Sequence, residues 1–173
     1  MGIKIKKLYN IESFSARSFE SVSDELILIN LELKADSVYF DSRPFHYRYD
    51  FGDFPPLDIS FDSETGLLKE ITLFVSKSCL KHDNEAGDIK IHSVTGYPCA
   101  STDFLIKNEF YYDEICEMNI ALKDSSLSVS QSGSASCKKV IVNENLSILL
   151  DESEVITGVV FNNLSNDNLN LFE

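Results

Sequence analysis

Residues 57–75 read LDISFDSETGLLKEITLFV and hold two apolar runs on either side of an acidic turn. The runs, 57–61 and 67–75, alternate apolar and polar side chains with the period of two that is typical of β-strands. Asp and Gly in the intervening DSETG favour a tight reversal, because they hydrogen-bond the local backbone and tolerate positive φ. Pro55 and Pro56 cannot donate to a β-ladder, so we expect the first run to begin directly after them. The segment therefore predicts an antiparallel hairpin.

A second hairpin of the same form is predicted 89 residues further along the chain, where LSILLDESEV occupies residues 146–155. At this offset Leu57, Ile59 and Asp62 fall on Leu146, Ile148 and Asp151. The same offset lays DELILINLELKADSVYF (24–40) over DEICEMNIALKDSSLSV (113–129) with six identities. A shared offset in two separate blocks favours an internal duplication. We therefore predict one domain, residues 1–173, built from repeats at 20–90 and 109–173 with a connector at 91–108.

The expected fold class is mainly β, with two duplicated antiparallel lobes related by a pseudo-twofold axis and forming a sandwich or one continuous sheet. At most one or two short helices are expected. Residues 13–26 could form one, and Ser165-Asn166-Asp167 could cap a last turn that reaches Leu171 and Phe172. In the connecting region IKIHSV (89–94) alternates like a short strand, and Tyr97-Pro98 is expected to break it.

The charge of the chain narrows the kinds of partner it can have. Fifteen Lys and Arg face 28 Asp and Glu, which gives a net charge of −13, and repeats 20–90 and 109–173 each carry −8. Such a field repels phosphate backbones and anionic lipid, so nucleic acid and membranes are not expected as direct partners. A folded acidic surface favours a cationic protein partner. Solubility alone is the alternative explanation of the charge.

The amino-terminal sequence and the cysteines indicate the cellular compartment of the protein. The sequence MGIKIKKLYNIESF lacks the long apolar region of a secretory signal, so we expect a cytoplasmic protein. The four cysteines are irregularly spaced and form no Cys-x-x-Cys pair, which favours reduced thiols that act as small apolar residues over a zinc site.

The segment DSRPFHYRYDFGDF (41–54) is the most distinctive candidate for binding, because aromatic residues and arginine dominate interface hot spots. Its counterpart at 130–143 is rich in small residues. We expect most of the aromatic rings to fill the space beside the small residues of that counterpart, and we expect the two arginines and the histidine to reach the surface. The small residues are Gly133, Ala135 and Cys137, and the surface candidates are Arg43, His46 and Arg48.

Other candidate sites have simpler explanations. The oxygen and nitrogen donors of the loop at 82–88 lack the spacing of a calcium loop. The hairpin carboxylates, Asp62 with Glu64 and Asp151 with Glu152 and Glu154, are expected to be exposed and to serve the turns. The alternating serines of 126–136 could form an edge that accepts a partner strand, although a mobile hairpin is the stronger expectation. No nucleophile elbow, phosphate loop or zinc motif occurs. We therefore predict no catalytic residue, no metal, no cofactor and no enzymatic activity.

With the hairpin phrase at 57–75, its small size and its acidic charge, the chain is similar to bacterial immunity proteins. These proteins neutralise the toxic carboxy-terminal domains of contact-dependent growth inhibition and related polymorphic toxins. The resemblance implies tight binding of a cognate basic toxin domain, of which a nuclease is one kind, and occlusion of its active site or substrate surface. The alternatives are a ligand-binding or self-associating β-sandwich module, as monomer or homodimer, and an enzyme of unrecognised type.

Within the immunity hypothesis the predicted partner-binding residues cluster in sequence around the aromatic segment of the first repeat. They are Asp36, Asp41, Arg43, His46, Arg48, Asp50, Asp53, Asp62 and Glu64.

Overall fold

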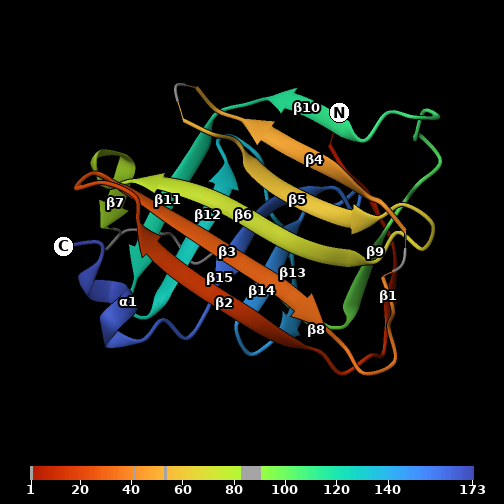
Figure 1. Ribbon diagram of the computed structural model, residues 1–173, viewed down its shortest axis with the longest axis horizontal. Helices are drawn as coiled ribbons and strands as arrows, with labels where there is room; N and C mark the ends of the chain where they lie inside the picture. The colour runs from red at the N-terminus through yellow and green to blue at the C-terminus, as the bar shows by residue number, and fades with distance from the viewer. Residues whose placement is uncertain (1, 41, 53, 83–90) are drawn as a thin grey trace.

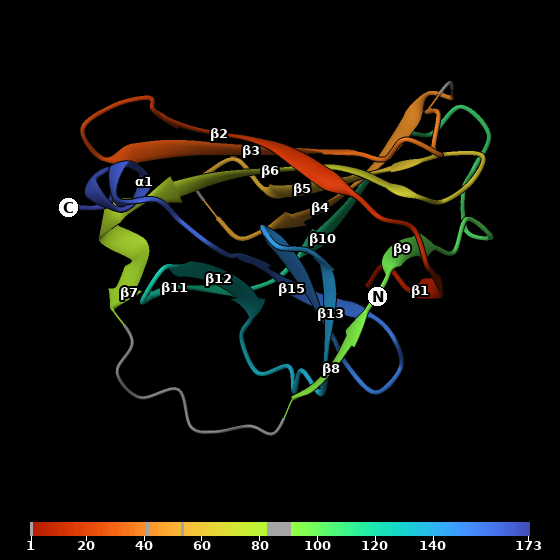
Figure 2. The same cartoon turned by 90° about the horizontal axis from the view of Figure 1, so that it is seen from below.

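The protein is a mainly β sandwich of two sheets, as a computed structural model that describes residues 2–40, 42–52, 54–82 and 91–173 shows (Figures 1 and 2). The described chain contains a single α-helix, so the predicted fold class is confirmed, with the sandwich as its form. Apolar side chains from the facing sides of both sheets form one continuous core.

The first sheet has six strands, which lie in front in Figure 1. In spatial order they are β10 (Tyr111–Ile115), β4 (Pro44–Asp50), β5 (Leu57–Asp62), β6 (Leu68–Ser76), β3 (Leu26–Lys34) and β2 (Phe14–Ser21). Neighbouring strands are antiparallel except at one edge, where β10 runs parallel to β4.

The second sheet has seven strands and forms the opposite layer. In spatial order they are β7 (Leu80–His82), β11 (Met118–Lys123), β12 (Ser126–Gln131), β15 (Ile156–Phe161), β14 (Leu146–Leu150), β13 (Lys138–Asn143) and β8 (His92–Thr95). The outermost pairs, β7 with β11 and β8 with β13, are parallel, and the others are antiparallel. A short 3-10 turn at Lys77–Cys79 connects β6 to β7.

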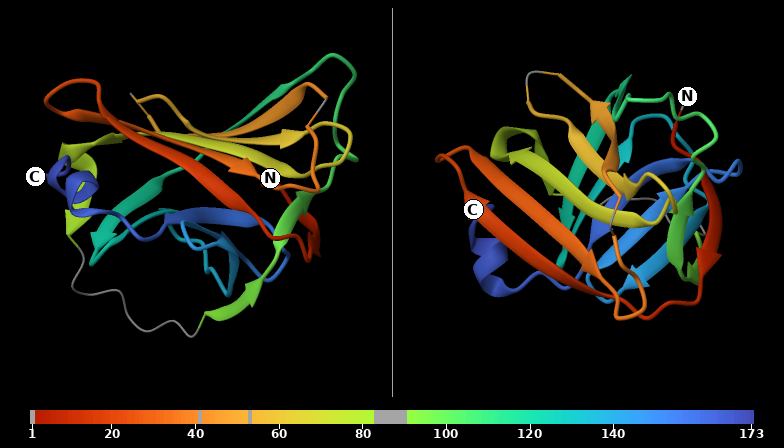
Figure 3. Two further views of the ribbon diagram at one scale, coloured as in Figure 1. Left: turned by 60° about the horizontal axis from the view of Figure 1, so that its bottom comes forward. Right: turned by 45° about the vertical axis from the view of Figure 1, so that its right-hand side comes forward.

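A third, two-stranded sheet joins the ends of the two layers. It pairs β1 (Ile5–Tyr9) with β9 (Tyr97–Ala100), and isolated bridges tie it to both large sheets (Figure 3). The short strand expected at 89–94 is present as β8, and it ends at Thr95, before Tyr97-Pro98, as expected. Tyr97-Pro98 then begins a new strand, which was not expected, and Pro98 lies within β9 opposite Leu8. A ladder pairing with only one neighbouring strand leaves a position where the missing N–H of proline costs little.

The expectation of a helix over residues 13–26 is wrong. Residues 14–21 form β2, which pairs with β3 along its whole length, so the tertiary ladder decides the structure of a stretch with mixed polar spacing. The carboxy-terminal helix is confirmed. The helix α1 (Asn166–Asn170) begins after Ser165, whose hydroxyl accepts from the backbone N–H of Asn168 in a capping box.

Both hairpins quoted from the sequence are present. Strand β5 begins at Leu57, directly after Pro55-Pro56, and its turn into β6 uses Gly66 at a φ of 76°. The second hairpin joins β14 to β15.

The predicted duplication is not confirmed as stated. The orders β4-β5-β6-β3-β2 and β13-β14-β15-β12-β11 match strand for strand, and each has a parallel strand beside its first member. The offset of 89 residues aligns the two hairpins correctly. It also lays β3 on β11, although β11 has the position in the second sheet that β2, and not β3, has in the first. The reason is a difference in connections: a two-residue turn leads from β11 to β12, whereas residues 35–43 form a long connection from β3 to β4.

The aromatic residues of β4 belong to the core, in a different way from the one predicted. Phe45 stacks on Phe61 with ring centroids 5.3 Å apart, and Tyr49 is buried between the sheets. Gly133 and Ala135, which were expected to receive these rings, are exposed. The rings therefore pack among other aromatic side chains and not against the small residues of 130–143.

Candidate binding face

The outer face of the six-stranded sheet is formed by alternate side chains that point away from the second sheet. No helix of the described chain lies over it, and Figure 1 looks directly onto it. We call this surface the outer face. Its members on the two edge strands are Tyr111, Asp113 and Ile115 of β10 and Phe14, Ala16, Ser18 and Glu20 of β2.

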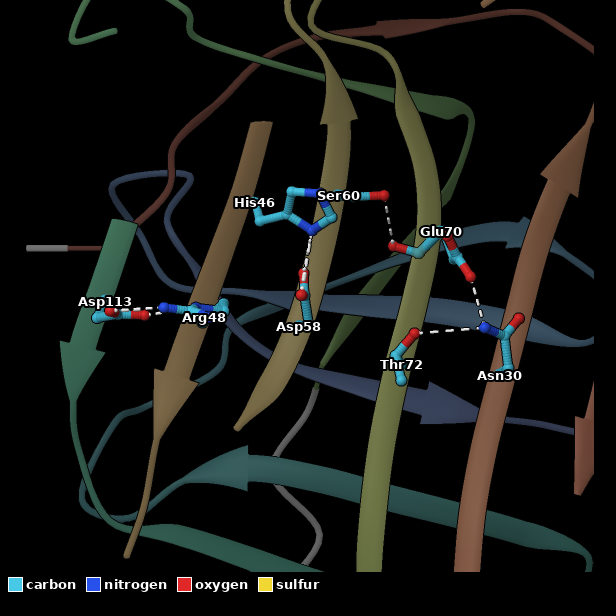
Figure 4. A network of polar contacts seen from close by, with 8 residues as sticks. All are labelled: Asn30, His46, Arg48, Asp58, Ser60, Glu70, Thr72 and Asp113. Atoms are coloured by element: carbon cyan, nitrogen blue, oxygen red, sulfur yellow. Dashed lines mark hydrogen bonds and ion pairs between the residues drawn. The ribbon is translucent and has the colours of Figure 1, made fainter. Parts of the chain in front are cut away.

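One row of polar residues crosses all six strands of the outer face, and Figure 4 shows its members from Asp113 to Asn30. Each member lies opposite the next in the ladder, so their side chains are neighbours across the sheet. In order from β10 to β2 the row is Asp113, Arg48, Asp58, Thr72, Asn30 and Ser18.

Arg48 and Asp113 form a two-point contact at the β10 end of this row. The Nε of Arg48 donates to Oδ1 of Asp113 at 2.6 Å, and its Nη2 donates to Oδ2 at 2.8 Å. The hydrogen bond that Arg48 donates to Asp113 raises the pKa of Arg48 despite some desolvation. The guanidinium also lies over the ring of Tyr111, 4.9 Å from its centroid. Because the Arg48 side chain is 30% and the Asp113 side chain 51% exposed, water screens the pair, which orients side chains more than it stabilises the fold.

His46 belongs to the neighbouring row of the outer face, where it lies between Tyr111 and Ser60, and it contacts the first row through Asp58. Its Nδ1 lies 2.9 Å from Oδ1 of Asp58, and its ring stacks on Tyr111 at 4.8 Å between centroids and 16° between planes. Tyr111 therefore contacts both His46 and Arg48, and the three side chains form one polar and aromatic cluster at the β10 edge of the sheet.

On the far side of the outer face, Asn30 links β3 to β6. Its side-chain amide donates to a carboxylate oxygen of Glu70 and, at 3.4 Å, to the hydroxyl of Thr72. These cross-strand contacts fix the position of the carboxylate of Glu70 on an open sheet surface (Figure 4).

The outer face is strongly acidic. Six carboxylates lie at its ladder positions, together with the basic side chains of Arg48 and Lys34 and the imidazole of His46, and Lys34 lies 3.6 Å from Glu32. The carboxylates are those of Glu20, Glu32, Asp50, Asp58, Glu70 and Asp113.

The structure brings together three of the residues predicted from the sequence. His46, Arg48 and Asp50 lie on the outer face. Arg43 lies just before β4 with its guanidinium 4.0 Å from the ring centroid of Phe110. Asp36 is exposed in the turn after β3, and Asp41 and Asp53 lie outside the described residues.

Asp62 is the last residue of β5 and Glu64 lies in the turn that follows, and of these two only Glu64 is exposed. Asp62 is 2% exposed, which corrects the expectation that the hairpin carboxylates project into solvent. Its carboxylate accepts hydrogen bonds from the backbone N–H of Glu64 and Thr65 and from the hydroxyls of Thr65 and Ser42. Burial opposes ionisation, but these donors together outweigh it and lower the pKa of Asp62.

Sequence reasoning missed the other half of the outer face. Asp58, Glu70 and Asn30 each occupy the polar position of an alternating strand, so their exposure to one side could have been expected. The placement of Asp113 beside Arg48 could not, because it depends on a parallel pairing between segments 65 residues apart.

The serine-rich strand is not an edge. Ser126, Ser128 and Ser130 belong to β12, which pairs with β11 on one side and β15 on the other. A partner strand therefore cannot be added along β12, so the weaker of the two possibilities, an edge, is wrong for this part of the run. Ser132, Ser134 and Ser136 lie in the connection between β12 and β13.

The remaining candidate sites show no specific set of ligand-binding side chains in the described residues. Of the predicted ligand loop, residues 83–88 and the side chain of His82 lie outside the described residues. Within the part of the chain that is described, no cluster of three or more His, Cys, Asp or Glu side chains could hold a metal ion. All four cysteines are free. A pocket of about 500 Å³ beside β4 is lined by Lys4 and Asp103 together with Tyr47 and Phe104, a mixture that selects no single class of ligand.

Comparison with known proteins adds no relative: no protein-family model matches the sequence, and no curated protein matches it either. In the described ranges no helix combines the length and the apolar character needed to cross a membrane.

Proposed function

We propose that this protein is a cytoplasmic, non-enzymatic binding protein whose outer face binds a cationic protein. In line with the resemblance carried by residues 57–75, the partner is a basic toxin domain that the protein neutralises by covering its active site or substrate surface. The observation that supports this most directly is the open, six-carboxylate face of a sheet that no helix of the described chain covers.

An open acidic face of this kind contributes to binding in two ways. Opposite net charges accelerate diffusional encounter, and this acceleration falls as salt screens the charges. Exposed apolar and aromatic side chains then hold the complex once water is excluded. Tyr111 and Ile115 offer such side chains at the β10 border, where they are 50% and 89% exposed.

Charge reversal on the face tests the proposal. The face variant combines Glu20→Lys, Glu32→Lys and Asp50→Lys. The control variant, Glu117→Lys, Glu144→Lys and Glu152→Lys, has the same net charge and changes exposed residues outside the outer face. Both variants and the unaltered protein are immobilised, and proteins retained from host lysate at low and high salt are identified by mass spectrometry.

The expected partner is a basic polypeptide whose toxicity the purified protein inhibits. At low salt we expect the face variant to associate at least about tenfold more slowly than the control variant, because it loses the local attraction. Equal association rates for the two variants, or a rate insensitive to ionic strength, would exclude the outer face as the binding surface. Retention of acidic partners alone would contradict the proposed kind of partner.

A further inference from the structure

We infer that the partner adds a β-strand to the edge of β10 that pairs with no strand of the described chain, and so extends the six-stranded sheet, with a basic side chain placed beside Asp113. The identity of the partner rests on the proposed function, whereas the properties of the edge can be tested without it.

The hydrogen bonds at the two ends of β10 define which of its backbone groups face outward. The N–H of His46 donates to the carbonyl of Phe110 at 2.7 Å, and the N–H of Cys116 donates to the carbonyl of Asp50 at 2.9 Å. In a parallel ladder only alternate residues of a strand bond to a given neighbour. The even-numbered residues of β10 therefore face β4, and the N–H and C=O groups of Tyr111, Asp113 and Ile115 face away from it.

This edge lacks several of the features that usually prevent strand addition. Natural edge strands carry lysine, proline or a bulge, or are covered by another element. Strand β10 contains neither lysine nor proline, and its register with β4 is unbroken. Its charged residues are both acidic: Asp113 lies on the outer face, and Glu114 points inward and accepts a hydrogen bond from the hydroxyl of Tyr47. The opposite edge differs: Arg17 of β2 donates to the carbonyls of Asn162 and Asn163, and Phe19 packs edge-on against Phe172.

Charge decides which strand the edge accepts. The outer-face side chains of β10 read aromatic, acidic, apolar, at Tyr111, Asp113 and Ile115. A second copy paired about a twofold axis centred on Asp113, the register that pairs all five residues of β10, would place Asp113 opposite Asp113, and like charges directly opposite each other are destabilising. Arg48 already contacts Asp113, but Asp50 and Asp58 keep the surroundings negative. A strand with a basic residue between two apolar residues at alternate positions complements this edge in shape and charge.

A palindromic peptide tests the edge directly. The probe is acetyl-Thr-Val-Thr-Lys-Thr-Val-Thr-amide, whose alternate side chains fit either strand direction. We expect its titration into isotopically labelled protein to shift the amide resonances of Tyr111, Asp113 and Ile115. Their exchange with solvent deuterium should slow by about tenfold at saturation, because these N–H groups gain acceptors. The amides of Tyr112 and Glu114, which already face β4, serve as internal references.

Matched controls separate strand addition from general attraction. The same peptide with Glu in place of Lys should bind at least about tenfold more weakly, since its charge is repelled. Ile115→Lys should abolish the shifts, whereas Ile106→Lys, an equal change at an exposed position outside β10, should preserve them.

Three results would overturn the inference. They are an absence of edge shifts with the Lys peptide, equal binding of the Lys and Glu peptides, and a dimer in sedimentation that Ile115→Lys dissolves, since this would make a second copy the occupant. If the peptide fails while the face variant still slows partner association, the proposed function stands without strand addition. If the peptide binds but the face variant changes nothing, the edge is a separate binding site.

Discussion

Asp62 shows how one buried carboxylate can organise a turn. Its Oδ1 accepts from the N–H and the hydroxyl of Thr65, both at 2.8 Å, while its Oδ2 accepts from Ser42 in the connection between β3 and β4. Asp151 occupies the matching turn of the second sheet and accepts from the N–H groups of Ser153 and Val155. Asp62 therefore ties a distant loop to its hairpin, whereas Asp151 serves its own turn.

We expect Asp62→Ala to lower the free energy of unfolding by about 2 kcal/mol, because hydrogen bonds to a charged, buried acceptor are lost. Urea unfolding at neutral pH measures this, with Glu64→Ala as a nearby exposed control that should change stability little. A variant as stable as the control would contradict the role assigned to the carboxylate.

The same residue gives a pH dependence. The pKa of Asp62 is lower in the folded protein than in the unfolded chain, so its ionised form stabilises the fold above the unfolded value near 4. This contribution is lost as the pH falls through the folded pKa. The stability difference between the unaltered protein and Asp62→Ala should therefore shrink between pH 5 and the acid limit of folding, which urea titrations over that range can follow.

Among the strands, β15 lies close against the backbone of β12 at Gly158. A Cβ at this position would lie 2.3 Å from the carbonyl oxygen of Val129 and 2.9 Å from the Cα of Ser130. Backbone atoms cannot yield as a flexible side chain can, so only glycine fits between these strands.

Gly158→Ala should therefore separate β12 from β15 and lower the free energy of unfolding by about 2 kcal/mol or more. Thermal unfolding measures the loss, and hydrogen exchange should show it concentrated in the amides of these two strands. Gly2→Ala is a useful contrast: its Cβ would also meet an atom closely, at 2.2 Å, but that atom belongs to the Val155 side chain, which can move. A larger loss in Gly2→Ala than in Gly158→Ala would contradict this explanation.

Elements with local signals were predictable from the sequence, and those fixed by distant pairing were not. The hairpin of β5 and β6 was found because its proline start, alternation and acidic turn all lie within about twenty residues. Strand β2 was mistaken for a helix because only its pairing with β3 decides its conformation. In the candidate site, His46 and Arg48 were identified from their aromatic neighbours, while their partners Asp58 and Asp113 required knowledge of strand order.

At the scale of the whole molecule, the two layers are joined by polar as well as apolar contacts. The hydroxyl of Tyr49 in the first sheet donates to the carbonyl of Ile156 in the second at 2.8 Å. Burial, together with the nearby Tyr47, Glu114 and Cys116, raises the pKa of Tyr49 well above its ordinary value.

Tyr49→Phe should lower the free energy of unfolding by about 1 kcal/mol at neutral pH, the usual net value of one hydrogen bond. Above the unfolded tyrosine pKa near 10, ionisation favours the unfolded state of the unaltered protein, so the variant should lose its disadvantage as the pH rises. Denaturant unfolding at pH 7 and pH 11 tests both statements. Tyr39→Phe, at a position 83% exposed, is the control and should match the unaltered protein at neutral pH.

The late position of β10 in the chain has a consequence for synthesis. A ribosome delivers β2 to β6 well before residues 111–115, and domains begin to form from the amino-terminal side as the chain emerges. Until β10 arrives, β4 is the outermost strand of the growing sheet, and its inward-facing aromatic rings still lack the opposite layer. A nascent chain that pauses before Tyr111 therefore presents an unpaired strand to the crowded exit of the ribosome, where a chaperone or another nascent chain can bind it.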